Sequence, residues 1–220
     1  MARIAEDLVL LLLDNASARP ALDESRRQRV LSAAVLLDLA YTCRIRPSEP
    51  GESAPPGCLV VLMGLGPDDP ALVPALRALS RKPTTPADAI ARLRRRVEPQ
   101  LLEHLALSGY VQRIRLYTNS FRRREAWTLT DRGRPAAARA SMISTLLDGQ
   151  PPDPPTAAII SLLHTVDGLR ALLSLDARGW RRVNGRAAEI ASGSWVNESI
   201  GRLPEVNLAV TTAAIRPALS

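Results

Sequence analysis

Residues 23–44 read DESRRQRVLSAAVLLDLAYTCR, and this stretch decides the fold. It is helix-like throughout, and between Val30 and Ala40 nearly every face of such a helix is apolar. A helix that is apolar all round is stable only when other elements surround it. The stretch therefore predicts a helical bundle with this helix at its centre.

The segments around this central helix also favour helices. We predict them over 4–13, 86–108, 132–147, 156–164, 167–174, 178–191 and 194–215, with a further helix starting at Asp69 and Pro70. Pro99 lies inside 86–108 and is expected to kink that helix, unless a new helix begins there. CLVVLMGLG, residues 58–66, is a short β-type or buried apolar segment.

One segment has the pattern of strands. YVQRIRLY and RRREAWTLT alternate residue by residue on either side of the turn TNSF, which predicts a β-hairpin over about 110–130. Elsewhere, 46% of the chain is hydrophobic but only 3% is aromatic, which suits helices packed on helices. The expected fold is all-α: a helical bundle with one protruding β-hairpin, in a single domain over 1–220.

The residues of common catalytic and metal sites are scarce. Cys43 and Cys58 lack metal spacing and are too few for a disulfide framework, and His104 and His164 lie on apolar helices, as core histidines do. No nucleophile elbow or phosphate-cradling loop is present. We expect no cofactor, no metal and no enzymatic activity. The apolar run in the first helix is too short for a membrane span and wrong for a signal peptide, so a cytoplasmic location is expected.

The positive charge is concentrated in one fifth of the chain. Residues 91–135 hold eleven arginines and four acidic residues, and their excess equals the +7 of the whole chain. Such a concentrated field predicts a polyanionic partner, either lipid headgroups or nucleic acid, although a solvated basic face has the same composition. Lys82 is the only lysine, which indicates a GC-rich genome rather than phosphate recognition.

A DNA-binding function is the alternative hypothesis. The run from LLEHLALSGYVQRIRL to RRREAWTLTDRGRPAAA resembles the end of a winged-helix domain, with a helix, a basic two-stranded wing and the entry into the next helix. A winged helix also needs a helix, a tight turn and a recognition helix upstream. The sequence predicts one long helix there instead.

Five segments, in their order and spacing, resemble the Golgi phosphoprotein 3 family, in a bacterial-looking version. They are IAEDLVLLLLD, VLLDLAYTCRI, VEPQLLEHLALSGYV with its hairpin, AAIISLLHTVDGL and SGSWVNESI. The resemblance implies a helical bundle with a protruding hairpin that binds phosphatidylinositol 4-phosphate on membranes. In eukaryotic members it implies an adaptor that retains glycosyltransferases in the Golgi.

The resemblance also implies headgroup-binding residues, which this sequence matches only in part. One of the two arginines expected before the hairpin is Arg95, but the other position is Glu98, the arginine expected on the central helix is Ser32, and the expected Trp falls near Asp23. Arg92 and Arg29 could substitute from adjacent turns. The predicted headgroup-binding set comprises Arg29, Arg92, Arg95, Arg113, Arg115, Arg122, Arg123 and Arg124, on a protein that associates reversibly with anionic membranes.

The hairpin also suggests self-association. We expect one basic face and one apolar face, the latter carrying Ile114, Leu116, Trp127 and Leu129. A two-stranded hairpin that protrudes alone is only marginally stable in water, so something must cover the apolar face. Either the chain's own bundle or a second protomer would do so.

Overall fold

The computed structural model describes residues 3–14, 20–64, 69–117, 123–196 and 203–219. Among them the elements are, in chain order, α1 (Arg3–Leu13), α2 (Glu24–Tyr41), β1 (Ile45–Pro47), β2 (Leu59–Val61), α3 (Val73–Leu79), α4 (Pro86–Leu93), α5 (Val97–Leu107), β3 (Val111–Tyr117), β4 (Arg123–Leu129), α6 (Gly133–Leu147), α7 (Pro154–Thr165), the 3-10 helix η1 (Leu169–Ala171), α8 (Ala177–Ala191), α9 (Leu203–Ile215) and the 3-10 helix η2 (Arg216–Ala218). The predicted fold, a helical bundle with a protruding β-hairpin, is confirmed.

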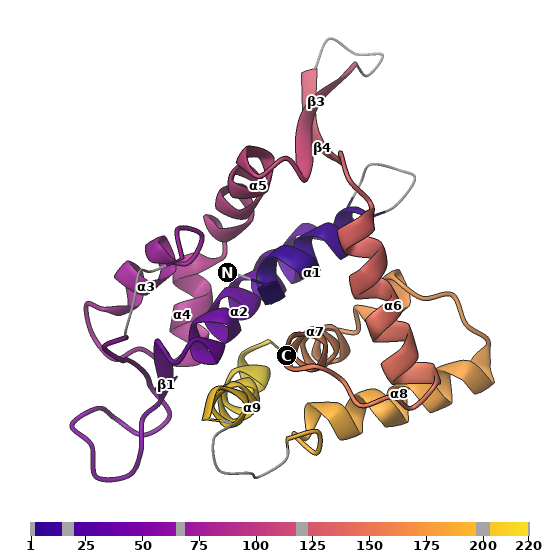
Figure 1. Ribbon diagram of the computed structural model, residues 1–220. Coiled ribbons are helices and arrows are strands. Elements are labelled where there is room, and N and C mark those ends of the chain that lie inside the picture. The colour runs from indigo at the N-terminus through magenta and orange to yellow at the C-terminus, as the bar shows by residue number, and fades with distance from the viewer. Residues whose placement is uncertain (1–2, 15–19, 65–68, 118–122, 197–202, 220) are drawn as a thin grey trace.

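Two antiparallel helices, α1 and α2, form the centre of the bundle, and the sequence predicted the central place of α2. Every residue of α2 from Val30 to Ala40 is buried, and so are most residues of α1. In Figure 1 these two helices cross the middle of the molecule, with α3, α4 and α5 on one side and α6, α7, α8 and α9 on the other. A helix buried on all sides needs this arrangement, because no face of it can be left in water.

The predicted long helix over 86–108 is wrong in one respect. It is two helices, α4 and α5, and the break lies at residues 94–96 rather than at Pro99. Pro99 lies in the first turn of α5, where a missing backbone N–H costs little. Leu93 and Val97 are buried on either side of the break, so packing rather than proline decides its place. α5 ends before Gly109, whose φ of +78° favours glycine.

The predicted hairpin is confirmed as β3 and β4, and it projects from the end of α5 away from the bundle (Figure 1). Its turn lies outside the described residues. The register corrects the predicted faces: Arg113 pairs with Trp127 and Val111 with Leu129, whereas Ile114 pairs with Ala126. Directly opposed residues share a face. Trp127 and Leu129 therefore lie on the face of Arg113, opposite to Ile114.

Two smaller differences concern short elements. β1 and β2 form a two-stranded antiparallel sheet in which Ile45 pairs with Val61, and the sequence pattern gave no hint of β1. The helix predicted over 167–174 is only the three-residue η1. The described part of the last predicted helix, 194–215, is helical from Leu203.

Candidate anion-binding site

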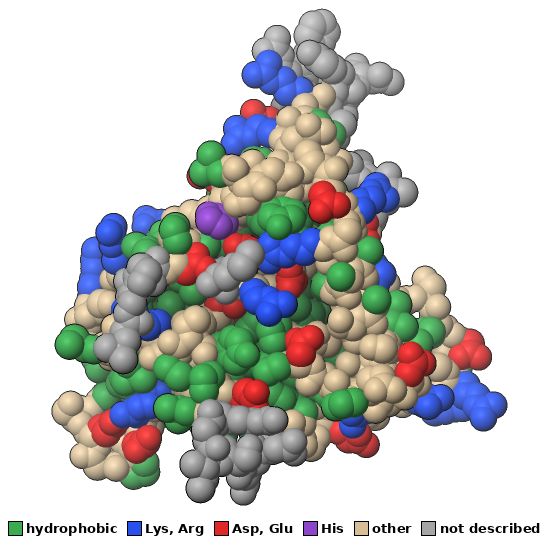
Figure 2. Space-filling view, in the orientation of Figure 1, with side chains coloured by type: hydrophobic (Ala, Val, Ile, Leu, Met, Phe, Trp, Pro, Cys, Tyr) green, Lys and Arg blue, Asp and Glu red, His purple; other side chains and the backbone are tan. Residues whose placement is uncertain are grey.

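Six basic side chains line one open pocket where α3 faces the junction of α4 and α5. Its volume is about 830 Å³, and its lining residues are Pro74, Arg77, Ala78, Arg81, Lys82, Ala91, Arg92, Arg95 and Arg96. Among the described residues, no acidic side chain lines it. Figure 2 shows Lys and Arg side chains gathered at the left edge of the molecule, beside α3 and α4. We call the six side chains the basic cluster.

The positive charge of the basic cluster is poorly compensated by the described residues of the chain. All six side chains are exposed, and none of them makes an ion pair with any described residue. Between these side chains and the described residues, the one hydrogen bond runs from Arg92 Nη1 to Thr84 Oγ1, at 3.3 Å. Six like charges around one cavity repel each other, and a bound anion relieves that repulsion.

The local structure explains how distant residues reach this pocket. Arg77 and Arg81 are four residues apart, so they lie along one side of α3 and its end. The loop that carries Lys82 is tied down at Thr84, whose carbonyl oxygen accepts a hydrogen bond from the Leu59 N–H at 2.8 Å. Thr85 then caps α4 by accepting a hydrogen bond from the Asp88 N–H. These contacts bring the end of α3 against α4.

The family's expected headgroup positions have other contacts in this structure. Glu98 accepts a hydrogen bond from Arg27 Nε at 2.6 Å, and both side chains are mostly buried. Ser32 is buried and donates to the Gln28 carbonyl, while Asp23 caps the start of α2. The side chains at these positions therefore stabilise helices. The exposed cations are those of the basic cluster, in the neighbouring pocket.

The predicted site residues divide into three groups. Arg92 and Arg95 line the pocket, as members of the basic cluster. Arg29 does not line it and instead donates from Nη1 to the Leu219 carbonyl at 3.0 Å. The hairpin arginines lie on a separate projection. The predicted set lacked Arg77, Arg81, Lys82 and Arg96. Arg96 belongs to the arginine-rich region, and the signal for Arg77 and Arg81 was their four-residue spacing.

The hairpin carries its own positive charge. Arg113 lies over the ring of Trp127, at 5.0 Å from the centroid, and pairs with Glu125 at 3.4 Å. Arg115 is exposed. Arg122 lies outside the described residues, and the structure does not describe the side chains of Leu116, Arg123 and Arg124. The described arginines of the hairpin are thus partly compensated by Glu125.

The histidines lie within the helical bundle. His104 Nε2 lies 3.4 Å from Glu6 Oε1, and burial lowers the pKa of His164, with Arg216 acting in the same direction. In the part of the chain that the structure describes, no three His, Cys, Asp or Glu side chains are grouped as metal ligands. None of the described helices is both long and apolar enough to cross a membrane.

The fold and the basic cluster define a class of protein: a helical bundle around a buried central helix, with a projecting hairpin and a concentrated cationic surface. The family model of Golgi phosphoprotein 3 (GPP34) matches residues 4–204, so the chain belongs to this family. Its members are known as non-enzymatic, lipid-binding adaptors associated with the Golgi. No curated protein matches the chain significantly.

Proposed function

We propose that this protein is a peripheral membrane-surface adaptor that binds anionic lipid headgroups reversibly, without catalysing a reaction. The observation that carries the proposal is the basic cluster, in which six exposed cations share one pocket and no acidic side chain is among the described residues that line it. Membership of a lipid-binding family supports the choice of lipid as the polyanion. The hairpin arginines supply a second, weaker cationic surface.

The expected strength of this attachment is moderate. Each Lys or Arg near an anionic bilayer contributes about 1 kcal/mol, and the contribution falls off within a Debye length of about 8 Å at physiological salt. Only the cluster members that face the bilayer contribute fully. Binding should therefore be reversible and sensitive to ionic strength, as suits a protein that cycles on and off a surface.

Headgroup preference should follow charge more than stereochemistry. The positions of Asp23, Ser32 and Glu98 lack the side chains that the family uses for phosphatidylinositol 4-phosphate. An open pocket of about 830 Å³ lined by flexible arginines accepts anions of several shapes. We expect phosphatidylinositol 4-phosphate to bind as one anionic lipid among others.

Vesicle flotation tests the proposal with a charge-matched control. The test variant combines Lys82→Gln, Arg92→Gln and Arg95→Gln in the basic cluster. The control combines Arg178→Gln, Arg181→Gln and Arg182→Gln, three exposed arginines on α8. On vesicles containing phosphatidylglycerol or phosphatidylinositol 4-phosphate, the first variant should lose most of its binding and the control little. Equal losses would mean that net charge alone matters and would contradict a defined site.

DNA binding is the second candidate, and the break at residues 94–96 favours it. With that break, α4, α5 and the hairpin follow one another in the order of a helix-turn-helix with a wing. However, α5 would have to enter the major groove, and its exposed side chains are Pro99, Gln100, Glu103 and Leu107. A helix without Lys or Arg and with an exposed glutamate is repelled by phosphates. A gel shift at matched salt distinguishes the two functions.

A further inference from the structure

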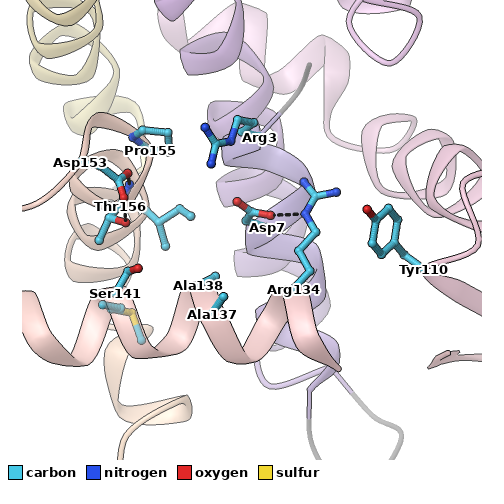
Figure 3. A pocket seen from close by; sticks show the side chains of 12 residues that line it. Arg3, Asp7, Tyr110, Arg134, Ala137, Ala138, Ser141, Asp153, Pro155 and Thr156 are labelled. Atoms are coloured by element: carbon cyan, nitrogen blue, oxygen red, sulfur yellow. Dashed lines mark hydrogen bonds and ion pairs between the residues drawn. The ribbon is translucent and has the colours of Figure 1, made fainter. Parts of the chain in front are cut away.

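A second cavity lies on another part of the bundle, where α1, α6 and the start of α7 meet. Its volume is about 430 Å³, within the range of small-molecule sites. Figure 3 shows Arg3 and Asp7 on one side, Asp153 and Thr156 on the other, and α6 crossing below them. Small side chains of α6, Ala137, Ala138 and Ser141, leave the space between the helices open.

Among the described residues, the polar wall of this cavity carries two cations and two carboxylates. Asp7 and Arg134 are already engaged: Arg134 Nε donates to Asp7 Oδ1 at 2.6 Å, and Arg134 Nη2 pairs with Glu6 at 2.7 Å. The guanidinium of Arg134 also lies over the Tyr110 ring, at 5.0 Å from the centroid. Burial raises the pKa of Asp7, and Arg134 and Arg3 oppose that rise. Asp7 and Arg134 are therefore held in place by contacts within the chain.

The other two charged residues are not paired with each other or with any described residue. Arg3 is exposed and makes no ion pair with a described residue. From the described residues, Asp153 accepts hydrogen bonds only from the backbone N–H and the hydroxyl of Thr156, at the start of α7. Neither Arg3 nor Asp153 thus forms an ion pair with a described residue, and the charge of Arg3 acts on Asp7 without an ion pair between them.

We propose that this cavity binds a small zwitterion, with its anionic group against Arg3 and its ammonium group against Asp153. A purely anionic ligand would meet two carboxylates and a purely cationic one would meet two arginines, whereas the lining has as many cations as carboxylates. The apolar wall, formed by Met142, Pro155 and Ile159, accepts an aliphatic substituent. Free α-amino acids and the ethanolamine headgroup of a phospholipid share this chemistry.

Calorimetry with matched ligands tests the proposal on the full chain. The zwitterionic probes are L-valine, L-leucine, L-methionine and glycerophosphoethanolamine. N-acetyl-L-leucine lacks the cation and L-leucine amide lacks the anion. We expect saturable binding of at least one zwitterion, and binding of each single-charge analogue weaker by about tenfold or more, because each loses one charge-assisted hydrogen bond. Binding by an amino acid identifies a free metabolite, and binding by glycerophosphoethanolamine and by phosphatidylethanolamine vesicles identifies a lipid.

Two variants assign the binding to this cavity. Asp153→Asn removes the charge but keeps a good cap for α7, and Arg3→Gln removes the cation. Each should weaken zwitterion binding by about tenfold. The matched controls, Asp176→Asn at the start of α8 and Arg178→Gln, should bind like the original protein. The proposal is overturned if no zwitterion binds, if a single-charge analogue binds as tightly, or if both cavity variants bind normally. None of these outcomes affects the membrane proposal, which rests on the basic cluster.

Discussion

Arg27 donates a hydrogen bond from Nε to Glu98 at 2.6 Å, joining α2 to α5. Glu98 stands where the Golgi phosphoprotein 3 family is expected to have a headgroup-binding arginine. The side chains of Arg27 and Glu98 are only 15% and 16% exposed, so the pair is largely shielded from water. A position where the resemblance implies a headgroup-binding arginine thus stabilises the bundle here, and the exposed cations lie in the nearby basic cluster.

Replacing Glu98 with Gln should destabilise the protein without reducing lipid binding. The substitution leaves the partly buried Arg27 without its counterion, which costs about 1–2 kcal/mol. For a chain of this size that lowers the Tm by roughly 2–4 °C per kcal/mol. Glu103→Gln, on the exposed side of the same helix, is the control and should change the Tm little. Similar Tm values for both variants would show that the pair contributes nothing.

Vesicle binding should weaken steeply with salt. Attraction between exposed cations and an anionic bilayer is screened as the Debye length shrinks from about 10 Å at 0.1 M to about 3 Å at 1 M. Flotation on phosphatidylglycerol vesicles should therefore be strong at low salt and nearly absent at 1 M NaCl. Binding that persists at 1 M NaCl would indicate that apolar insertion, not charge, holds the protein on the membrane.

The hairpin arginines should contribute to the same binding. Replacing Arg113, Arg115, Arg122, Arg123 and Arg124 together with Ser should reduce flotation by up to about fivefold for each arginine that faces the bilayer, since each contributes about 1 kcal/mol. Arg113 should contribute less because Glu125 compensates it. Circular dichroism should show an unchanged helical content. Flotation equal to that of the original protein would leave the basic cluster as the sole attachment site.

The sequence predicted the central helix and the hairpin because both depend on local patterns. The burial of Val30 to Ala40 follows from their uniform apolarity, and the strands follow from strict alternation. The break at residues 94–96 could not be predicted this way, because three consecutive arginines are good helix formers. It depends instead on how Leu93 and Val97 pack against the rest of the bundle.

The two faces of the hairpin and the members of the basic cluster were harder to predict, for a related reason. Alternation within each strand was correct, but a shift of one residue between two strands exchanges their faces, and the register is set by turn geometry. Two of the six cluster residues, Arg92 and Arg95, were predicted, and Arg96 belongs to the same arginine-rich region. Arg77, Arg81 and Lys82 are brought to it through the contact between Leu59 and Thr84. That contact joins residues 25 positions apart, and no local pattern encodes it.

Self-association through the hairpin remains a prediction, now with a changed surface. Trp127 and Leu129 pack against the chain's own core, so they are less available to a partner. Ile114 is half-buried, lies on the other face and is absent from the core. We expect light scattering at tens of micromolar to detect an oligomer, and Ile114→Glu to convert it to a monomer. Arg115→Gln, on the opposite face, should leave the oligomer intact. A monomeric original protein at this concentration would refute the prediction.

Asp38 joins the two central helices through the start of α1. Its carboxyl oxygens accept hydrogen bonds from the backbone N–H groups of Ile4 and Ala5, at 3.0 and 2.9 Å. These donors have no partner within their own helix, so Asp38 satisfies them from α2. Burial raises the pKa of Asp38 from 3.8 to about 8, and the two hydrogen bonds only partly oppose that rise.

The contribution of Asp38 to the stability of the protein should therefore fall as the pH rises from about 4 to about 8. A carboxyl group whose pKa is higher in the folded than in the unfolded state binds more protons when folded, so its contribution is fully present below about pH 4 and is lost by about pH 8. The slope for one group is at most about 1.4 kcal/mol per pH unit. Urea unfolding of the original protein and of Asp38→Asn between pH 5 and 8 isolates this contribution, because the other titrating groups are common to both. The variant cannot titrate at this position, so the difference in unfolding free energy between original and variant should shrink as the pH rises. A difference that stays constant across the range would mean that Asp38 keeps one protonation state throughout.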